Sequence, residues 1–268
     1  MKSSIIISFL LIFGLKVLGQ NETLQKTFKL IDTKEEFIKA LDMLNEFIKS
    51  DTTNPEAYWQ RAKCLRRKGE YDKARKDINK ALELDSNNAN AFCELGTIYA
   101  MIGQYDNSLK NYNKAIELSP KTSHFYNNRG ALYYFFLNNS ENALLDFNKC
   151  VELDQNDQYA RFNRGLIYMD AENYSLAIIE FTTSLKIQPK DNKAHYNRGL
   201  SYYYLSENKK ALIDFKKAIK YNNKIDPFDR INLGEIYFFQ SFCYEELGQS
   251  KQAEKAMKMS KNLGYTNE

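Results

Sequence analysis

The sequence is poor in the two residues that most often interrupt helices. Its 268 residues include only 11 glycines and four prolines. Sandwiches and barrels need frequent Gly and Pro at their turns, so this scarcity argues against those folds and favours helices. Tyr and Phe are abundant by contrast, with 19 and 17 copies. They supply ample apolar area for packing one helix against another.

The residues and motifs of most enzyme active sites are also scarce. The chain has two histidines, His124 and His195, and neither stands in an HExxH motif. There is no P-loop, no GxSxG, and no GxGxxG opening a helix. His195 takes an early helical position that is aromatic elsewhere in the chain, which favours a packed side chain. The sequence therefore predicts no catalytic residues, no cofactor and no metal ion, and hence a protein without enzymatic activity.

The four cysteines do not form a recognisable framework. Cys64, Cys93, Cys150 and Cys243 have no paired spacing, and each falls on a predicted helix. Cys150 occupies a position that holds Ala or Ser elsewhere in the chain, as expected of a small packed side chain. Neither a disulfide framework nor a zinc site is predicted.

No excess of one charge is present either. The chain has 38 basic and 34 acidic residues, and 36 basic residues remain when Lys2 and Lys16 are set aside. A nucleic-acid-binding protein usually has a concentrated basic cluster, and none is evident along the sequence. Nucleic acid is therefore not an expected partner.

Residues 1–19 form a segment of their own. A basic start, Met1-Lys2, precedes an apolar run at 5–15 and a plausible cleavage site after Gly19. This pattern is typical of a secretory signal peptide, so we expect an exported protein, periplasmic or secreted. The alternative is an uncleaved membrane anchor, although the run is shorter than a typical span of about 20 residues and Lys16 interrupts it.

From Pro55 onward a block of about 34 residues recurs. Small residues mark its register, and a large apolar residue follows each after four positions. The small residues are Ala74, Ser108, Ala143, Ala177, Ala211 and Ala253, and the large ones are Ile78, Tyr112, Phe147, Phe181, Phe215 and Met257. A fixed period of this length predicts stacked units of two helices each, in which the small residues let the helices approach and the large one fills the gap to the next unit.

These blocks resemble the tetratricopeptide repeat (TPR). Its pattern of an aromatic residue, a Leu-Gly pair and a Tyr on the first helix is matched by Phe92, Leu95-Gly96 and Tyr99 in one block. Gly130 with Tyr133, Gly165 with Tyr168, and Gly199 with Tyr202 continue it, and Pro120 and Pro189 supply the closing proline of two blocks. The resemblance covers about four fifths of the chain. It implies an all-α fold, a right-handed α-solenoid of helix-turn-helix repeats.

The aligned blocks divide the chain. A degenerate N-terminal capping repeat is expected at 20–54, an insertion at 226–233, and a sixth repeat with a C-terminal tail at 234–268. The other five repeats are expected at 55–88, 89–122, 123–157, 158–191 and 192–225.

An arginine and an acidic residue occur together within the repeats. The four repeats with Arg just before the glycine position have an acid about sixteen residues later, and the two repeats without that Arg lack the acid. This predicts salt bridges between the two helices of a repeat, with binding of an anionic ligand by the arginines as the alternative. The predicted pairs are Arg61 with Asp77, Arg129 with Asp146, Arg164 with Glu180, and Arg198 with Asp214.

The resemblance also implies where a partner binds. In this family the first helices line a concave groove that is the usual binding surface. The groove positions carried over to this chain are Trp59, Lys63, Arg66, Asn127, Tyr134, Phe162, Leu166, Met169, Tyr196, Tyr203, Phe238 and Phe242. They are polar and basic near the N-terminus and apolar from the fourth repeat on. The alternative for the apolar ones is packing between adjacent helices.

Three functions stay open on the sequence. The first is an interaction scaffold that holds a peptide segment of a partner protein in the groove. The second is an assembly protein that self-associates, or docks on a partner, through its terminal repeats, because no solvating helix follows the last repeat. An enzyme is the remote third.

Overall fold

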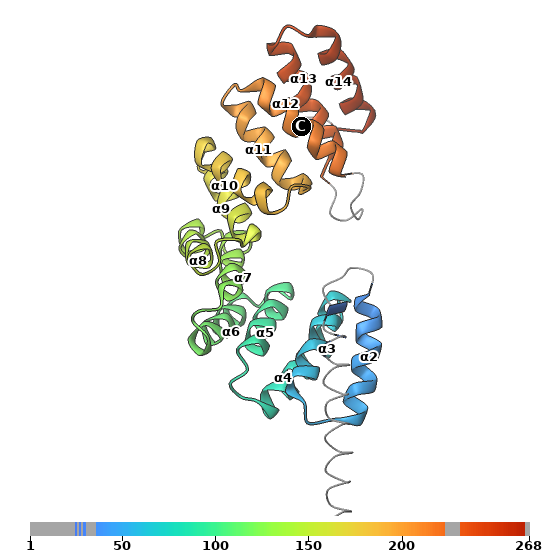
Figure 1. The fold of residues 1–268 in the computed structure, drawn as a ribbon, viewed down its shortest axis with the longest axis vertical. Helices are drawn as coiled ribbons and strands as arrows, with labels where there is room; N and C mark the ends of the chain where they lie inside the picture. The colour runs from blue at the N-terminus through green and yellow to red at the C-terminus, as the bar shows by residue number, and fades with distance from the viewer. Residues whose placement is uncertain (1–24, 26, 28, 31–35, 223–230, 266–268) are drawn as a thin grey trace, which may run out of the picture. The chain divides into compact units, whose positions relative to one another are not determined.

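The computed structural model describes residues 25, 27, 29, 30, 36–222 and 231–265. The predicted signal segment, 1–19, lies outside the described residues. Within them the chain is entirely helical, with no strand, and forms an α-solenoid of successive helix pairs (Figure 1). The helices are α2 (Phe37–Ser50), α3 (Pro55–Arg67), α4 (Tyr71–Leu84), α5 (Ala89–Met101), α6 (Tyr105–Leu118), α7 (Ser123–Phe135), α8 (Ser140–Leu153), α9 (Gln158–Asp170), α10 (Tyr174–Ile187), α11 (Asn192–Tyr204), α12 (Asn208–Asn222), α13 (Leu233–Glu246) and α14 (Ser250–Asn262).

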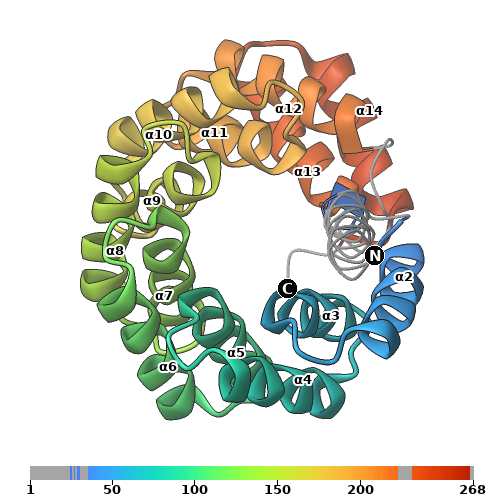
Figure 2. The same ribbon diagram turned by 60° about the horizontal axis from the view of Figure 1, so that its bottom comes forward.

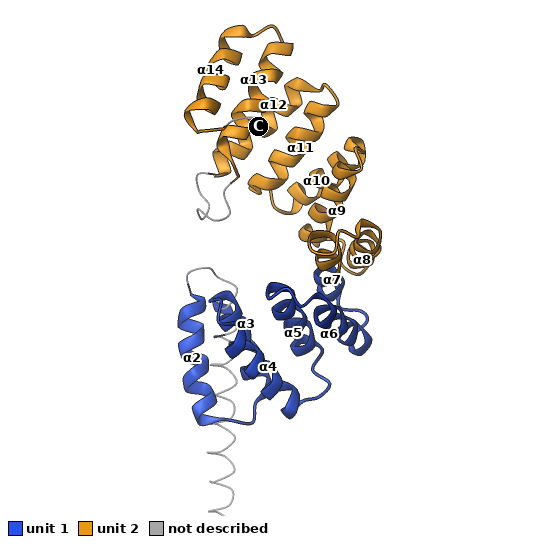
Figure 3. Cartoon of the chain, turned by 180° about the vertical axis from the view of Figure 1, so that it is seen from behind, with its two compact units in different colours: residues 1–128 blue, residues 129–268 orange. Residues whose placement is uncertain are grey.

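The chain divides into two compact units, residues 1–128 and 129–268 (Figure 3). In unit 1, α3 packs on α4 and α5 on α6, while α2 packs on α3. In unit 2 the pairs are α9 with α10, α11 with α12, and α13 with α14. Helix α7 crosses the division between residues 128 and 129.

Each unit has two layers of helices. In unit 2, α9 contacts α11 and α11 contacts α13, so the first helices of successive pairs touch directly. Their partners α10, α12 and α14 form the second layer (Figure 2). In unit 1, α3 and α5 make the same direct contact. We refer below to a first-helix layer and a second-helix layer within each unit.

The first helices begin at polar caps. The side chains of Asn54, Asn88, Asp157 and Asp191 each accept a hydrogen bond from the amide three residues later, over 2.8–3.1 Å. Each cap satisfies one of the free amides at a helix start.

The turn inside each pair needs a left-handed backbone. Gly69, Gly103 and Gly248 provide it in three pairs, with φ of 83°, 76° and 70°. Other residues take the same conformation in the remaining turns, where Glu172 has φ 56° and Ser206 has φ 59°. An L-residue is strained there, because its Cβ crowds the following carbonyl.

In the four pairs from α5–α6 to α11–α12, a glycine of the first helix faces an aromatic ring of the second, whereas α3–α4 has Ala62 and Ile78 at these positions. A Cβ added to Gly165 would lie 2.7 Å from Phe181 Cε1, and one added to Gly199 would lie 2.8 Å from Phe215 Cδ1. Phe181 and Phe215 are fully buried. The aromatic residue is expected to fill the gap to the next repeat, but it also has a second contact, within its own pair. Its ring lies on the glycine of its own pair, because only glycine leaves room for it there.

The last pair departs from this pattern. Ser241 replaces the glycine and Met257 replaces the ring, and both line an open hollow of about 580 Å³ between α13 and α14. The exposed residues of α14 are mostly Lys, Gln, Glu and Asn. Helix α14 therefore presents a mainly polar surface, in which Met259 is 37% exposed, and association through the terminal repeats stays a prediction.

A buried asparagine joins the two flanks of the predicted insertion, most of which lies outside the described residues. Asn222, 1% exposed, accepts a hydrogen bond from the Ile231 amide over 2.9 Å and donates one to the Ile231 carbonyl over 3.1 Å. It also accepts a bond from Asn192 Nδ2, over 3.0 Å. The end of α12 is thereby tied to the residues that lead into α13.

Candidate functional site

The four arginines selected from the sequence each meet the acid predicted for them. Arg61 donates to Asp77 from Nε and Nη2, over 2.6 and 2.7 Å. Arg129 makes the same pair of bonds to Asp146, and Arg198 to Asp214. Arg164 reaches Glu180 only through Nη2, over 2.6 Å, and its Nε is buried without a hydrogen-bond partner. The two parallel bonds made by Arg61, Arg129 and Arg198 are the strong geometry for a guanidinium and a carboxylate.

Three of these arginines also reach a helix that precedes their own pair. Arg61 Nη1 donates to Asn45 on α2, Arg164 Nη1 to Asn148 on α8, and Arg198 Nη1 to Thr182 on α10, over 2.9–3.2 Å. This link was not predicted from the sequence, although a polar residue directly follows the large apolar one in each of those helices. Each of these guanidiniums thus ties three helices together, which favours the structural role over binding of an anionic ligand.

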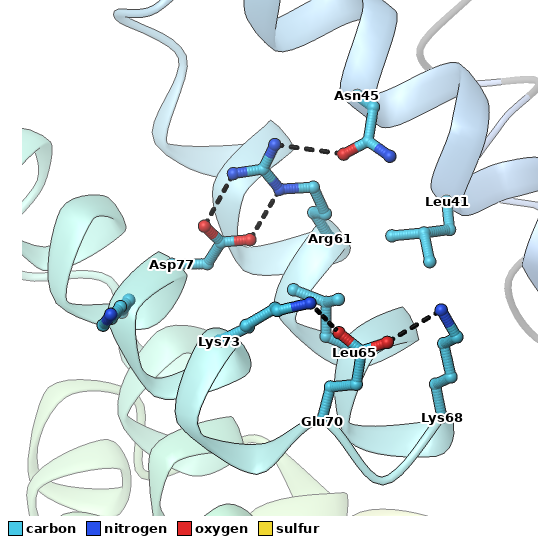
Figure 4. A pocket seen from close by; sticks show the side chains of 9 residues that line it. Leu41, Asn45, Arg61, Leu65, Lys68, Glu70, Lys73 and Asp77 are labelled. Atoms are coloured by element: carbon cyan, nitrogen blue, oxygen red, sulfur yellow. Dashed lines mark hydrogen bonds and ion pairs between the residues drawn. The ribbon is translucent and has the colours of Figure 1, made fainter.

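In a hollow of about 390 Å³ in unit 1, basic side chains are again paired with acids of the chain itself (Figure 4). Arg61, Lys68, Lys73 and Lys76 give it a basic wall. Arg61 is held by Asp77 and Asn45, however, and Glu70 accepts from Lys68 and Lys73 over 2.7 and 2.6 Å. These two lysines lower the pKa of the Glu70 carboxyl to about 2. Most of the charge that an anion would need is already neutralised.

The predicted groove residues of unit 1 are half-buried and largely committed to contacts within the chain. Arg66 forms an ion pair with Glu94 on α5. Lys63 lies near Glu56, whose pKa is raised chiefly by burial. Trp59 packs against the core of unit 1. Asn127, on α7, is half-buried. The expected basic character at this end is thus offset by carboxylates.

Unit 2 carries a continuous apolar stripe on α9. Phe162, Leu166 and Met169 recur at helical spacing and are half-buried, and Tyr159, one turn earlier, is 65% exposed. Residues spaced in this way lie on one face of a helix. We call Tyr159, Phe162, Leu166 and Met169 the α9 stripe. Tyr159 is the most exposed large apolar side chain of the described residues.

The neighbouring first helices extend this surface. Tyr203 on α11 packs edge-on against Phe239, with ring centroids 5.2 Å apart. Phe238 on α13 contacts Phe242 at 4.8 Å and Tyr265 at 5.3 Å. Tyr203, Phe238 and Phe242 remain half-buried. Part of each aromatic side chain therefore stays available at the surface.

Tyr196 does not belong to that accessible surface. It is only 8% exposed and packs against Phe215, with ring centroids 6.2 Å apart. Its hydroxyl has no hydrogen-bond partner of good geometry and faces Glu235, so burial and that carboxylate raise its pKa. Sequence spacing placed Tyr196 in the groove, but the close approach of α11 and α13 buries it.

Tyr134 joins two first helices of unit 2. Its hydroxyl hydrogen-bonds to the Asp170 carboxylate at the end of α9, and burial together with that carboxylate raises the Tyr134 pKa. Asp170 directly follows Met169, the last residue of the α9 stripe. The bond to Asp170 therefore holds Tyr134 at the edge of that stripe.

Exposed lysines are concentrated on two helices of unit 2, although no basic cluster is evident along the sequence. Helix α12 carries five exposed lysines and α14 four, while Glu254 is the one exposed acid on these two helices. The two helices belong to the second-helix layer of unit 2. The folded chain thus concentrates positive charge that is spread along the sequence.

The remaining reactive residues are buried or packed. Cys64, Cys93, Cys150 and Cys243 are buried thiols without a disulfide. Burial raises the pKa of Cys93 and of Cys243 to about 12, so neither is a reactive thiolate. His195 is 3% exposed and lies between Asp214 and the Pro189 carbonyl. No group of residues suited to a metal ion occurs in the ranges that the structure describes.

Comparison with known families decides the nature of these repeats. Sequence models of the tetratricopeptide repeat match residues 54–121, 123–157, 159–191 and 192–225. The chain is a tetratricopeptide-repeat protein. This TPR protein has no match among curated proteins.

Solved TPR structures show the same fold. A structure of pilF from Pseudomonas aeruginosa aligns with a TM-score of 0.69 at 17% identity, covering 80% of this chain and 93% of that chain. PilW, a type IV pilus biogenesis factor, aligns at 0.66 and 20% identity, covering 80% of this chain and 95% of that one. YrrB, described as a TPR protein with an unusual peptide-binding site, aligns at 0.50 and 27% identity over 67% of this chain and 92% of its own.

The family places this TPR protein among protein-interaction scaffolds, which generally bind protein partners and typically have no catalytic activity. Among the described residues of the chain, no helix is long and apolar enough to cross a membrane.

Proposed function

We propose that this TPR protein holds an apolar peptide segment of a partner protein on the first-helix layer of unit 2. The α9 stripe carries the proposal, because it combines helical spacing, partial exposure and one largely open aromatic side chain. Aromatic and aliphatic anchors of this kind bury much area with few rotatable bonds. The likeness to YrrB supports a peptide ligand.

The peptide is expected to be apolar rather than acidic. Arg66 and Lys68 already pair with carboxylates of the chain. Some members of the TPR family grip a terminal carboxylate with polar groove residues, and in this chain Trp59 and Cys93 stand at two of the positions where such polar residues are needed. Binding at the α9 stripe should therefore depend little on ionic strength, since apolar contact is not screened by salt.

The test begins with selection of peptides from a random library on the wild-type protein. Selected peptides should contain aromatic or aliphatic anchors, and Tyr159→Ala or Leu166→Lys should weaken them at least about tenfold. The matched control is Phe136→Ala, which removes a 42% exposed aromatic outside the predicted groove. Equal binding to all variants, with unchanged circular dichroism, would overturn the proposal. A cross-linking pull-down from the native host, comparing the same variants, would then name the partner.

We further propose that the functional form is exported and begins at residue 20. The support is the basic start, apolar run and cleavage pattern of residues 1–19. The mass and N-terminal sequence of the protein isolated from its host test this directly. An intact Met1 in a membrane fraction would favour the uncleaved anchor instead.

A further inference from the structure

Three exposed aliphatic side chains recur at one repeat position on the second helices α8, α10 and α12 of unit 2. Leu145 on α8, Ile179 on α10 and Ile213 on α12 are 62%, 57% and 56% exposed. They are 34 residues apart and occupy the same repeat position, directly before the acid that pairs with the arginine. We call these three residues the outer ridge. Helices α8, α10 and α12 follow one another in the second-helix layer (Figure 2).

The ridge is confined to three consecutive repeats. The same position holds Lys76 and Lys110 in the first two repeats and Lys255 in the last. Solvated lysine thus occupies this position in the other three repeats. Three aliphatic side chains at an open helical position, bounded by lysines, mark a contact surface of limited length.

The charges beside the ridge change sign along it. On α8, Glu141 lies four residues before Leu145 and Glu152 seven residues after it. On α12, Lys209 and Lys220 stand at those same two offsets from Ile213. All four side chains are exposed, and Glu152 also forms an ion pair with Lys149 on its own helix, over 2.7 Å. Acids therefore flank Leu145 at the two offsets where lysines flank Ile213.

This arrangement is complementary to itself. A two-fold axis along α10 would place Ile179 against Ile179 of a second copy and Leu145 against Ile213. The same rotation sets Glu141 opposite Lys209 and Glu152 opposite Lys220, twice each. Such an isologous contact uses one patch on both copies. We propose that the outer ridge is a homodimer interface of this geometry.

The dimer is expected to be weak and reversible. Three aliphatic side chains per copy bury far less than the roughly 1,600 Å² of a standard stable interface. Lys186, seven residues after Ile179, would also face its own copy across the axis. Lys149 on α8 would likewise face Lys217 on α12, since each lies four residues after its ridge residue. Like charges opposite each other oppose association, so Lys186→Gln should tighten the dimer.

Sedimentation equilibrium of the intact chain, from about 1 to 500 µM, tests the interface. Ile179→Lys should raise the dimer dissociation constant at least about tenfold. Met101→Lys is the matched control, since it places a lysine at another exposed apolar residue, 49% exposed, on a first helix.

Charge exchange tests the pairing of α8 with α12. Glu141→Lys with Glu152→Lys should weaken the dimer, as should Lys209→Glu with Lys220→Glu. All four changes together should restore it, because opposite charges again face each other. These surface variants should keep the wild-type melting temperature.

Several outcomes would overturn the proposal. They are a monomer at every concentration, an unchanged dimer in Ile179→Lys, and no recovery in the fourfold exchange. Binding of a monomeric protein to anionic phospholipid vesicles, lost in Lys209→Glu with Lys220→Glu, would assign the lysines to a membrane surface instead. The peptide-binding test of the α9 stripe is independent of each of these results.

Discussion

Arg198 holds Asp214 through two parallel hydrogen bonds, Nε to Oδ2 over 2.7 Å and Nη2 to Oδ1 over 2.8 Å. His195 Nδ1 lies 3.0 Å from Asp214 Oδ1. Asp214 is 1% exposed, so its carboxylate depends on these partners. Burial alone would raise the Asp214 pKa, but the hydrogen bonds from His195 and Arg198 outweigh it, and the pKa is lowered.

Because the folded-state pKa of Asp214 lies below its unfolded value, its contribution to stability is present above about pH 4. We expect that contribution to be lost as the pH falls further toward the folded-state pKa. Asp214→Asn should cost about 3–5 kcal/mol at pH 7, since it leaves a partly buried guanidinium without its charge partner. It should also flatten the pH dependence of unfolding below pH 4.

Urea unfolding at several pH values measures both effects. Glu117→Gln is the control, because it removes an exposed partner of Lys114 and should change stability by less than about 1 kcal/mol. An Asp214→Asn protein with the stability and acid sensitivity of wild type would contradict this account.

Asn222→Ala should loosen the start of the last helix pair. It removes a side chain that makes three hydrogen bonds in a buried place and leaves the Ile231 amide and carbonyl unpaired. We expect a loss of about 2–4 kcal/mol. Hydrogen exchange should show faster exchange in α13 and α14 than in α9 and α10. Uniform exchange across unit 2 would count against a local role for Asn222.

Gly165→Ala should destabilise unit 2 by about 1–3 kcal/mol, because its Cβ would overlap the buried ring of Phe181. The compensating variant Gly165→Ala with Phe181→Leu should recover part of the loss. Thermal melts of the single and double variants give the coupling between the two positions. Purely additive effects would mean that the ring and the glycine do not interact.

Glu172→Gly should stabilise the chain by about 1 kcal/mol, because it relieves a left-handed turn residue with φ 56°. Gly69→Ala is the converse change at φ 83°, where a Cβ would meet no other atom, and should destabilise by a similar amount. Melting temperatures of the pair therefore isolate backbone strain from packing. Shifts of the same sign in both variants would contradict this reading.

The sequence by itself determined the helical repeat and much of its interior. The 34-residue period, the small residues at Ala177 and Ala211, and the joint occurrence of Arg198 and Asp214 are all periodic. Periodic signals predict local packing well, because each repeat places equivalent residues in equivalent surroundings.

Only the tertiary structure decided which side chains stay accessible. Tyr196 and Phe162 occupy equivalent sequence positions, yet Tyr196 is buried while Phe162 is half-buried. Three further features likewise depend on how one helix pair meets the next. They are the lysines of α12 and α14, the bonds of Arg61, Arg164 and Arg198 to the preceding helices, and the hydrogen bonds of Asn222 to Ile231. That geometry is set by the volumes of side chains from several helices at once, and no single stretch of sequence contains it.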